Sequence, residues 1–390
     1  MIQKTGDNKL NVFIRRHMKK LFIFSIGIFC CSGLAINIFL ASPWGGIVSA
    51  SCRWDCTWYL DIAHHGYSIV PRATNLPSLG ISGNRPDVRT SQIGMANWAF
   101  FPLYPALTAL FAYVTKLNVA LIALMINIVL WPAVIWLCGR DLYVRGLTFN
   151  PILLALAFVL YPLNIWYTAQ YSEALYGVLL MLSILLLRKH EVGKAALCCG
   201  FLALARPTGF IIGVTLSLWW GYLQYIDKKE FRDILKEILL ITSLSGAGLS
   251  LYVLYLYYLM GDGFAFMHIE AAWNRHFRVF LFTMFHGFTH IKHLTDSLFA
   301  ILGSIIIWIM SRYKMWRLNA LLLGITGLLA LSTGITSIGR YIFANPLMIE
   351  FLTYKIISYP LIVRLPFLVV LAILHILTTI FWFRGSPIFL

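Results

Sequence analysis

An aspartate that follows the first long apolar stretch is the strongest candidate for chemistry. Asp55 stands between Trp54 and Trp58 in the segment SCRWDCTWYLDIAHHGY. A carboxylate can accept the proton that an alcohol loses as it attacks an electrophilic carbon, and partial burial against the two indole rings would make it a better acceptor. A solvated loop aspartate that caps the next helix has the same sequence signature. The segment alone leaves both interpretations open.

Two cysteines and two histidines surround this aspartate. Cys52, Cys56, His64 and His65 can be drawn as metal ligands, but their spacing matches no zinc pattern. We therefore expect no dedicated metal site, and the sequence holds no cofactor motif. A divalent cation held by Asp55 stays open as an alternative to proton transfer. We expect both histidines at the membrane interface, with a sugar contact of His65 as the alternative.

Six short blocks of sequence keep a fixed order between residues 50 and 345, and together they resemble one protein family. The family is that of the PIG-V-type mannosyltransferases, which belong to the GT-C membrane glycosyltransferases. The first block, with Asp55, Trp58, Tyr59, Gly66 and Tyr67, is similar to the family's first-loop signature. The others are FFPLYP (100–105), YSEAL (171–175), ARPTG (205–209), AWNR (272–275) and GRY (339–341).

The resemblance implies a fold, a donor and a reaction. The fold is an all-α polytopic GT-C-like membrane protein, and the donor is a hexose, expected to be mannose, on polyprenyl or dolichyl phosphate. The transfer is inverting and takes place on the non-cytoplasmic side, with Asp55 as the base. Two departures concern the acceptor, which stays unidentified: Ala174 replaces the usual serine, and residues 72–97 match no block.

A lipid phosphate that leaves needs positive charge where negative charge develops. Arg206 at a helix break and Arg340 beside Tyr341 offer guanidinium groups whose planar fork suits a phosphate, so we expect both arginines and Tyr341 to bind the donor. Anchoring to lipid headgroups is the alternative for the two arginines. Glu173 is expected to orient Arg206, to bind a sugar hydroxyl, or to cap a helix.

Aromatic side chains complete the expected substrate site. Trp54, Trp58 and Trp273 are candidates for sugar contacts, and Trp98 is a weaker one. The alternative for Trp98 and Trp273 is a place in the belt of aromatic residues at the membrane interface. Arg53, beside Trp54, is interpreted as a headgroup anchor.

Membrane helices must position these residues. Apolar spans are predicted near 21–40, 119–138, 150–165, 173–187, 238–259, 295–310, 318–333 and 365–383, with shorter pieces at 195–205, 209–223 and 343–353. The first span follows the basic segment 1–20, which we place in the cytoplasm, and we interpret it as an uncleaved helix. ARPTG divides 195–223 into two short helices that meet away from the cytoplasm.

Charge decides how the stretch 101–114 is interpreted. If it spans the membrane, Arg140 and Arg145 fall outside; if it lies along the outer surface, the basic residues of 140–145, 188–194, 228–236 and 312–317 all fall inside. The positive-inside rule favours the surface position. The result is about eleven helices, N-terminus inside, with outer regions 41–118, 161–172 and 260–294.

Composition excludes a soluble protein and leaves two functional classes. The 390 residues are 60% hydrophobic and 12% charged, so lipid must cover much of their surface. The net charge of +16 fits positive-inside loops on an anionic bilayer, and no motif indicates nucleic acid. We expect one domain, 1–390, in a bacterial inner membrane, or an ER membrane in a eukaryote. A non-enzymatic transporter or lipid-carrier flippase is the alternative to the glycosyltransferase.

Overall fold

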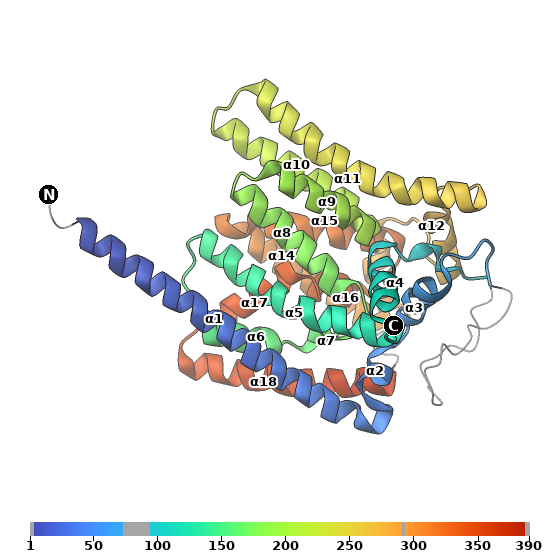
Figure 1. The fold of residues 1–390 in the computed structure, drawn as a ribbon, viewed down its shortest axis with the longest axis horizontal. Helices are drawn as coiled ribbons and strands as arrows, with labels where there is room; N and C mark the ends of the chain where they lie inside the picture. Colours follow the sequence, from blue (N-terminus) through green and yellow to red (C-terminus); the bar gives the residue numbers. More distant parts are fainter. Residues whose placement is uncertain (1–3, 73–93, 291–292, 387–390) are drawn as a thin grey trace.

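A computed structural model describes residues 4–72, 94–290 and 293–386, and this part of the chain is helical without a strand (Figure 1). Most of the insert 72–97 therefore lies outside the described residues. The α-helices are α1 (Lys4–Ala41), α2 (Gly46–Ser51), α3 (Cys56–His65), α4 (Leu103–Thr115), α5 (Val119–Val144), α6 (Pro151–Val159), α7 (Ile165–Thr168), α8 (Glu173–Arg188), α9 (Val192–Ala205), α10 (Pro207–Ile226), α11 (Phe231–Met260), α12 (Ala265–His268), α13 (Phe280–Phe285), α14 (Leu294–Arg312), α15 (Arg317–Thr333), α16 (Ile338–Phe343), α17 (Pro346–Ser358) and α18 (Leu361–Arg384). Short 3-10 turns are η1 (Ser42–Trp44), η2 (Asn97–Ala99), η3 (Pro162–Asn164), η4 (Ile269–Trp273), η5 (His286–Phe288) and η7 (Lys314–Trp316).

Long apolar helices make this chain a multi-pass membrane protein. Among the described residues, 6 helices are long and apolar enough to cross a bilayer, and they belong to α1, α5, α11, α14, α15 and α18. The pair formed by α6 and the turn η3 with α7 adds a seventh if its bend of 71° lies within one span. Each agrees in place with a predicted apolar stretch, because about 20 apolar residues match the ~30 Å hydrocarbon layer.

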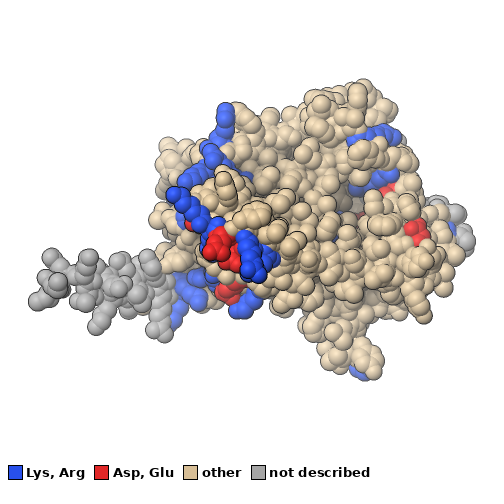
Figure 2. Space-filling model, turned by 90° about the horizontal axis from the view of Figure 1, so that it is seen from above, with Lys and Arg blue, Asp and Glu red and all other residues tan. Residues whose placement is uncertain are grey.

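The elements run back and forth between two ends of the bundle. Figure 1 shows α1 projecting from one end, and Figure 2 shows that most charged atoms in that view gather close to this end, next to a broad uncharged band. We call this end, with the last turns of α5 and α8, the inner end. The other end holds α2, α3, the start of α8 and the junction of α9 with α10, and we call it the outer end. The broad uncharged band next to the inner end in Figure 2 is the surface that lipid has to cover.

Helix α4 differs from its neighbours in direction and length. It has 13 residues, or about 20 Å, and it lies across the direction of α5 in Figure 1. Its side chains Leu110, Phe111, Tyr113 and Val114 are exposed. A short helix with an exposed apolar face fits the predicted position along the membrane surface.

Three helix breaks converge inside the bundle, two more than the single break that the sequence indicated. Tyr161, Arg206 and Asn345 have extended backbones, and a proline follows each of them. Proline disfavours the helical conformation of the preceding residue and then starts the next helix. The hydroxyls of Tyr161 and Tyr167 donate to the carbonyls of Phe343 and Ala344, at 3.0 and 2.6 Å. In the sequence, only the break at Arg206 was clear.

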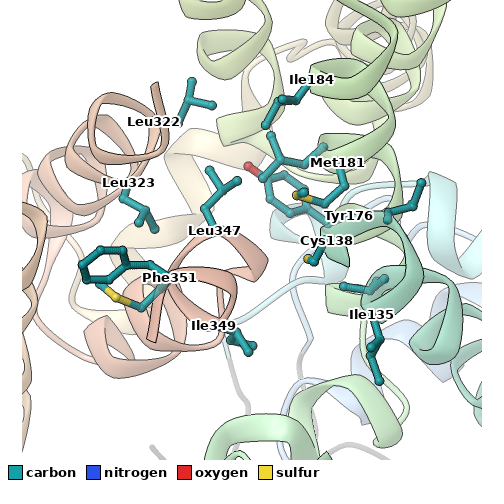
Figure 3. Close-up of a cluster of buried hydrophobic side chains, with 14 of the residues drawn as sticks. Ile135, Cys138, Tyr176, Met181, Ile184, Leu322, Leu323, Leu347, Ile349 and Phe351 are labelled. Atoms are coloured by element: carbon teal, nitrogen blue, oxygen red, sulfur yellow. The ribbon is translucent and has the colours of Figure 1, made fainter. Parts of the chain in front are cut away.

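The interior between the two ends is apolar. Figure 3 shows side chains of α5, α8, α15 and α17 that meet there, among them Cys138, Met181, Leu322 and Phe351. These side chains pack against one another and hold the four helices together. Such a close-packed core tolerates little change in volume, so the helices cannot shift freely. The outer and inner ends are therefore fixed relative to each other.

A buried ionic cluster closes the inner end. Arg145 binds Glu350 at 2.5 Å and Asp141 at 2.8 Å, and Arg188 binds the other oxygen of Asp141 at 2.7 Å. Asn319 donates to Glu350 at 2.9 Å. Arg145 was expected to be an ordinary basic loop residue, yet its side chain is 2% exposed. Its charge thus holds α5, α8, α15 and α17 together.

Cysteine labelling tests the direction of the bundle. Lys116 and Thr148 are exposed and lie beyond opposite ends of α5, Lys116 before its start and Thr148 after its end. In a Cys31→Ala background, we expect Lys116→Cys to react with an impermeant maleimide from outside and Thr148→Cys to react only after permeabilisation. The reverse pattern would mean that 101–114 spans the membrane and would contradict the surface position of α4.

Candidate active site

Arg340 joins two carboxylates at the outer end. Its Nη1 donates to Asp55 at 2.5 Å, and its Nε donates to Glu173. The side chain of Arg340 is 7% exposed and that of Glu173 is 4% exposed, while Asp55 is 32% exposed. Asp55 is therefore the acid that a substrate can reach, and Glu173 is the buried one. Because three sequence blocks supply these residues, their meeting depends on the whole fold.

Arg206 extends this charged network on the far side of Glu173. Its Nη2 binds the same Glu173 oxygen, and its Nε donates to the Ser172 hydroxyl at 3.1 Å. Ser172 also bonds with the hydroxyl of Tyr59 at 3.0 Å. Among the sequence expectations, Glu173 does orient Arg206, whereas the N-cap of α8 is Ser172 rather than Glu173. The side chains of Arg206 and Arg340 are both largely buried, unlike those of arginines that bind lipid headgroups.

Local sequence explains the position of Arg206. Pro207 follows it, so Arg206 is extended, with φ −156° and ψ 152°, and α10 begins immediately after it. Gly209 lets the first turn of α10 lie against the last turn of α9, because a Cβ there would clash with the carbonyl of Leu202. The block ARPTG thereby ends one helix, starts another, and directs one guanidinium towards α8.

A disulfide between Cys52 and Cys56 encloses Asp55. The two sulfurs are therefore bonded to each other, which rules out the metal arrangement with His64 and His65. Inside the loop Trp54 has a positive φ of 45°, a conformation that costs a bulky residue about 1–3 kcal/mol. Tyr171 fixes the same turn: its hydroxyl donates to the Arg53 carbonyl at 2.6 Å and accepts from the Asp55 N–H at 3.0 Å. The carboxylate thus stands on a constrained turn.

Arg53 binds the last helix instead of lipid headgroups. It is 2% exposed, and its guanidinium donates to the carbonyls of Trp382 and Phe383 in the last turn of α18. The last carbonyls of a helix lack the usual amide donor one turn further on, so the arginine bonds to them, and the Gly385 N–H also donates to the Trp382 carbonyl at 2.9 Å. The interpretation as a headgroup anchor was wrong, because this contact ties the Asp55 turn to the C-terminal helix.

The outer turn η4 adds a third guanidinium near Asp55. Arg275 lies 3.5 Å from Glu270, donates to the Thr336 carbonyl at 3.1 Å, and lies over the Tyr341 ring. Burial raises the pKa of Glu270 above its ordinary value; Arg275 opposes this shift and the charge of Asp55 adds to it. The guanidinium groups of Arg206, Arg340 and Arg275 thus gather around Asp55 and Glu173.

The tryptophans divide into one that is covered and three that are accessible. Trp58 is 2% exposed, with Phe100 stacked on its ring and the Arg72 guanidinium 4.9 Å from its centroid, so it offers no face for a sugar in this state. Trp273 meets the edge of Trp58 and is partly exposed. Trp54 packs edge-on against Trp382 and is also partly exposed. Trp98 is partly exposed as well, with its indole N–H bonded to the Ser68 carbonyl at 2.6 Å, so sugar contacts of Trp54, Trp98 and Trp273 stay predictions.

His65 and Asp61 belong to a separate cluster. His65 is exposed and bonds with Asp61 at 3.2 Å, and Asp61 is buried, paired with Arg72 and bonded to Asn97 at 3.0 Å. These contacts hold the end of α3 to the chain on either side of residues 73–93. The structure therefore does not place His65 with Asp55 and the arginines. In the described residues no three His, Cys, Asp or Glu side chains form a group that could hold a metal ion.

A small cavity lies next to the charged network. It is lined by Glu173, Arg206, Arg340, Tyr341 and residues at the break between α16 and α17, with a volume of about 10 Å³, room for roughly one water. The starts of α8, α10 and α17 contribute Glu173, Thr208 and Pro346 to its wall. Because a helix N-terminus carries partial positive charge, three of them beside two arginines favour an anion.

Comparison with known proteins adds no assignment. No protein-family model matches the chain, and a search of curated proteins finds no match. What the site can do must therefore be argued from its own geometry.

Opening the disulfide should disturb the position of Asp55 more than the fold. We expect the double variant Cys52→Ser/Cys56→Ser to stay folded, since α2 and α3 keep their packing, but to lose most of the activity proposed below. Steady-state rates with and without a membrane-permeant reductant measure this. Wild-type activity in the double variant would show that the bonds of Tyr171 and Arg53 hold the Asp55 turn without the disulfide.

Proposed function

We propose that the chain is an inverting glycosyltransferase that moves a hexose, expected to be mannose, from a polyprenyl- or dolichyl-phosphate donor to a lipid, glycan or protein acceptor. One observation carries this proposal. Asp55, Glu173, Arg206 and Arg340 come from four blocks far apart in sequence, and they form one contiguous network at the outer end. An accessible carboxylate beside a cationic anion site is what this reaction requires.

The proposed step can be assigned atom by atom. The acceptor oxygen attacks the anomeric carbon and forms the new glycosidic bond, while its proton passes to a carboxylate oxygen of Asp55. The bond between the anomeric carbon and the phosphate oxygen breaks, and the phosphate keeps the electron pair. Arg206 and Arg340 stabilise the charge that develops on the leaving phosphate, and attack from the opposite face inverts the anomeric centre.

The contact between Arg340 and Asp55 gives the reaction an order. While Arg340 binds Asp55, its guanidinium occupies one oxygen of that carboxylate. A donor phosphate in the cavity is a second anion that Arg340 can bind, and it attracts the guanidinium away from Asp55. Donor binding thereby frees the base, so the proposed order is donor first and acceptor second.

The architecture fits the same proposal. The 6 or 7 candidate spans fit a GT-C-like arrangement, and about eleven crossings, with the region 41–118 outside, remain part of the proposal. Because disulfides persist in oxidising compartments, the bond between Cys52 and Cys56 supports placing Asp55 on the non-cytoplasmic side of a bacterial inner membrane or an ER membrane.

A transporter or lipid-carrier flippase is the second candidate, and a specific observation favours it. Broken helices that meet within a bundle are typical of transporters, and three helix breaks converge here towards the outer end. The charged network at the outer end, with an accessible carboxylate, favours the enzyme. Sugar transfer by purified protein in detergent, where no membrane has to be crossed, separates the two classes.

Asp55→Asn is the decisive variant. It keeps the size and the hydrogen bond to Arg340 but cannot take the acceptor's proton. General-base contributions are typically about 10²–10⁴-fold, so turnover in detergent should fall by about that factor while donor binding changes only a few-fold. The assay measures transfer of labelled hexose from polyprenyl phosphate to an added membrane lipid extract.

Asp262→Asn is the matched control, because Asp262 is an exposed outer carboxylate that contacts His268 and the Phe264 N–H and lies outside the charged network around Arg340. It should keep wild-type turnover. Wild-type activity lost on adding a chelator would instead point to a cation held by Asp55. Near-full transfer by Asp55→Asn, with and without chelator, would remove Asp55 from the reaction.

Arg206 tests the donor site. Arg206→Lys keeps the charge but loses the planar fork and one of the contacts to Glu173 and Ser172, so we expect weaker use of the donor. Arg206→Ala should be worse, with the protein still inserted. KM for the donor is the readout, and equal values in all three proteins would leave Arg206 a structural partner of Glu173.

A further inference from the structure

We propose that a groove between α3, α4, α9 and α11 binds the isoprenoid chain of the lipid-phosphate donor. Its volume is about 350 Å³, within the ~300–1,000 Å³ range of ligand pockets. Its wall includes Ile62, Ala106, Ala109, Leu204, Leu251 and Tyr255. The inference rests on the proposed function and names the part of the protein that would hold the donor's hydrocarbon.

The wall of the groove is apolar even where tyrosines line it. The hydroxyl of Tyr67 donates to the Phe100 carbonyl at 2.6 Å, and the hydroxyl of Tyr252 donates to the Trp98 carbonyl at 2.6 Å. Since both hydroxyl groups are bonded to the backbone, these two tyrosines contribute apolar rings to the wall of the groove. A hydrocarbon chain loses no hydrogen bond by entering such a surface and gains by leaving contact with water or loose lipid.

The groove opens where lipid must lie. Leu251 and Tyr255 are 61% and 44% exposed and precede the end of α11 by about 7–14 Å. That depth corresponds to the outer half of the ~30 Å hydrocarbon layer. On the opposite side, Ala106 and Ala109 of the short helix α4 form the wall. A chain can therefore enter from the bilayer without passing through water.

The side of the groove that faces the helix bundle approaches Arg206. Leu204 lies two residues before Arg206, at the end of α9. Ile62 lies one turn along α3 from Tyr59, whose hydroxyl bonds with Ser172, the acceptor of the Arg206 Nε. A long apolar chain in the groove thus ends beside a guanidinium. This continuity matches one kind of molecule, an apolar chain with a phosphate at its end.

Filling the groove should discriminate between donors of different chain length. Two donors carry the same sugar on polyprenyl phosphate, one with a long isoprenoid chain and one with a short, water-soluble chain. For Ala109→Trp we expect KM for the long-chain donor to rise at least about tenfold, the loss that follows when two or more methylenes are kept from burial. KM for the short-chain donor should stay at the wild-type value, which also shows that the variant is folded.

Leu110→Trp is the matched control, because Leu110 is the next residue on α4, is 54% exposed, and does not line the groove. It should leave both KM values unchanged. Unchanged KM values in Ala109→Trp would overturn the groove while leaving the transfer reaction in place. An increase in KM for a lipid acceptor alone would also overturn it, because the groove would then hold the acceptor.

A binding measurement separates failure of the groove from failure of the proposed function. A photoreactive amino acid at Leu204 should crosslink to long-chain polyprenyl phosphate that carries no sugar, and Ala109→Trp should abolish the crosslink. Crosslinking by a protein that transfers no sugar would support the groove and refute the glycosyltransferase. Absence of the crosslink in a protein that transfers sugar from both donors would refute the groove alone.

Discussion

One guanidinium, that of Arg340, holds the outer end of the molecule in a single arrangement. It binds Asp55, from the first outer loop, and Glu173, at the start of α8, and Glu173 in turn binds Arg206. Removing a partner from a buried pair typically costs about 3–5 kcal/mol, because the other charge stays buried and uncompensated. The break before α17, the turn around Asp55 and the junction of α9 with α10 therefore depend on one another. Their positions are set by charge as much as by apolar packing.

A second ionic cluster at the inner end complements the first. Arg145, Asp141, Arg188 and Glu350 bind there, and α8 carries a member of each cluster, with Glu173 and Arg188 about 22 Å apart along the helix. Between them the side chains are apolar, so neither cluster can slide along the bundle. The donor is thus expected to move side chains at the outer end without shifting whole helices.

Sequence patterns predicted the parts of this molecule that depend on neighbours along the chain. Apolar stretches indicated the long helices, and the proline after Arg206 indicated the break that directs its side chain. The same signal before Pro162 and Pro346 could have found the other two breaks. What sequence could not predict depends on distant partners. Trp58 was expected to contact a sugar, but Phe100 and Arg72 cover its ring. Arg145 binds Glu350, which lies 205 residues further along the chain.

The bond between Arg53 and the end of α18 bears on how the protein is made. The chain is synthesised from its N-terminus, so the turn that carries Asp55 leaves the ribosome long before Trp382 and Phe383 exist. Until then the Arg53 guanidinium lacks the carbonyls that it binds in the finished protein. The turn around Asp55 is thus bonded to the last turn of α18, which is synthesised much later. A protein cut before Trp382 would keep the disulfide and the Tyr171 bonds of this turn but would lack the two bonds that tie it to α18.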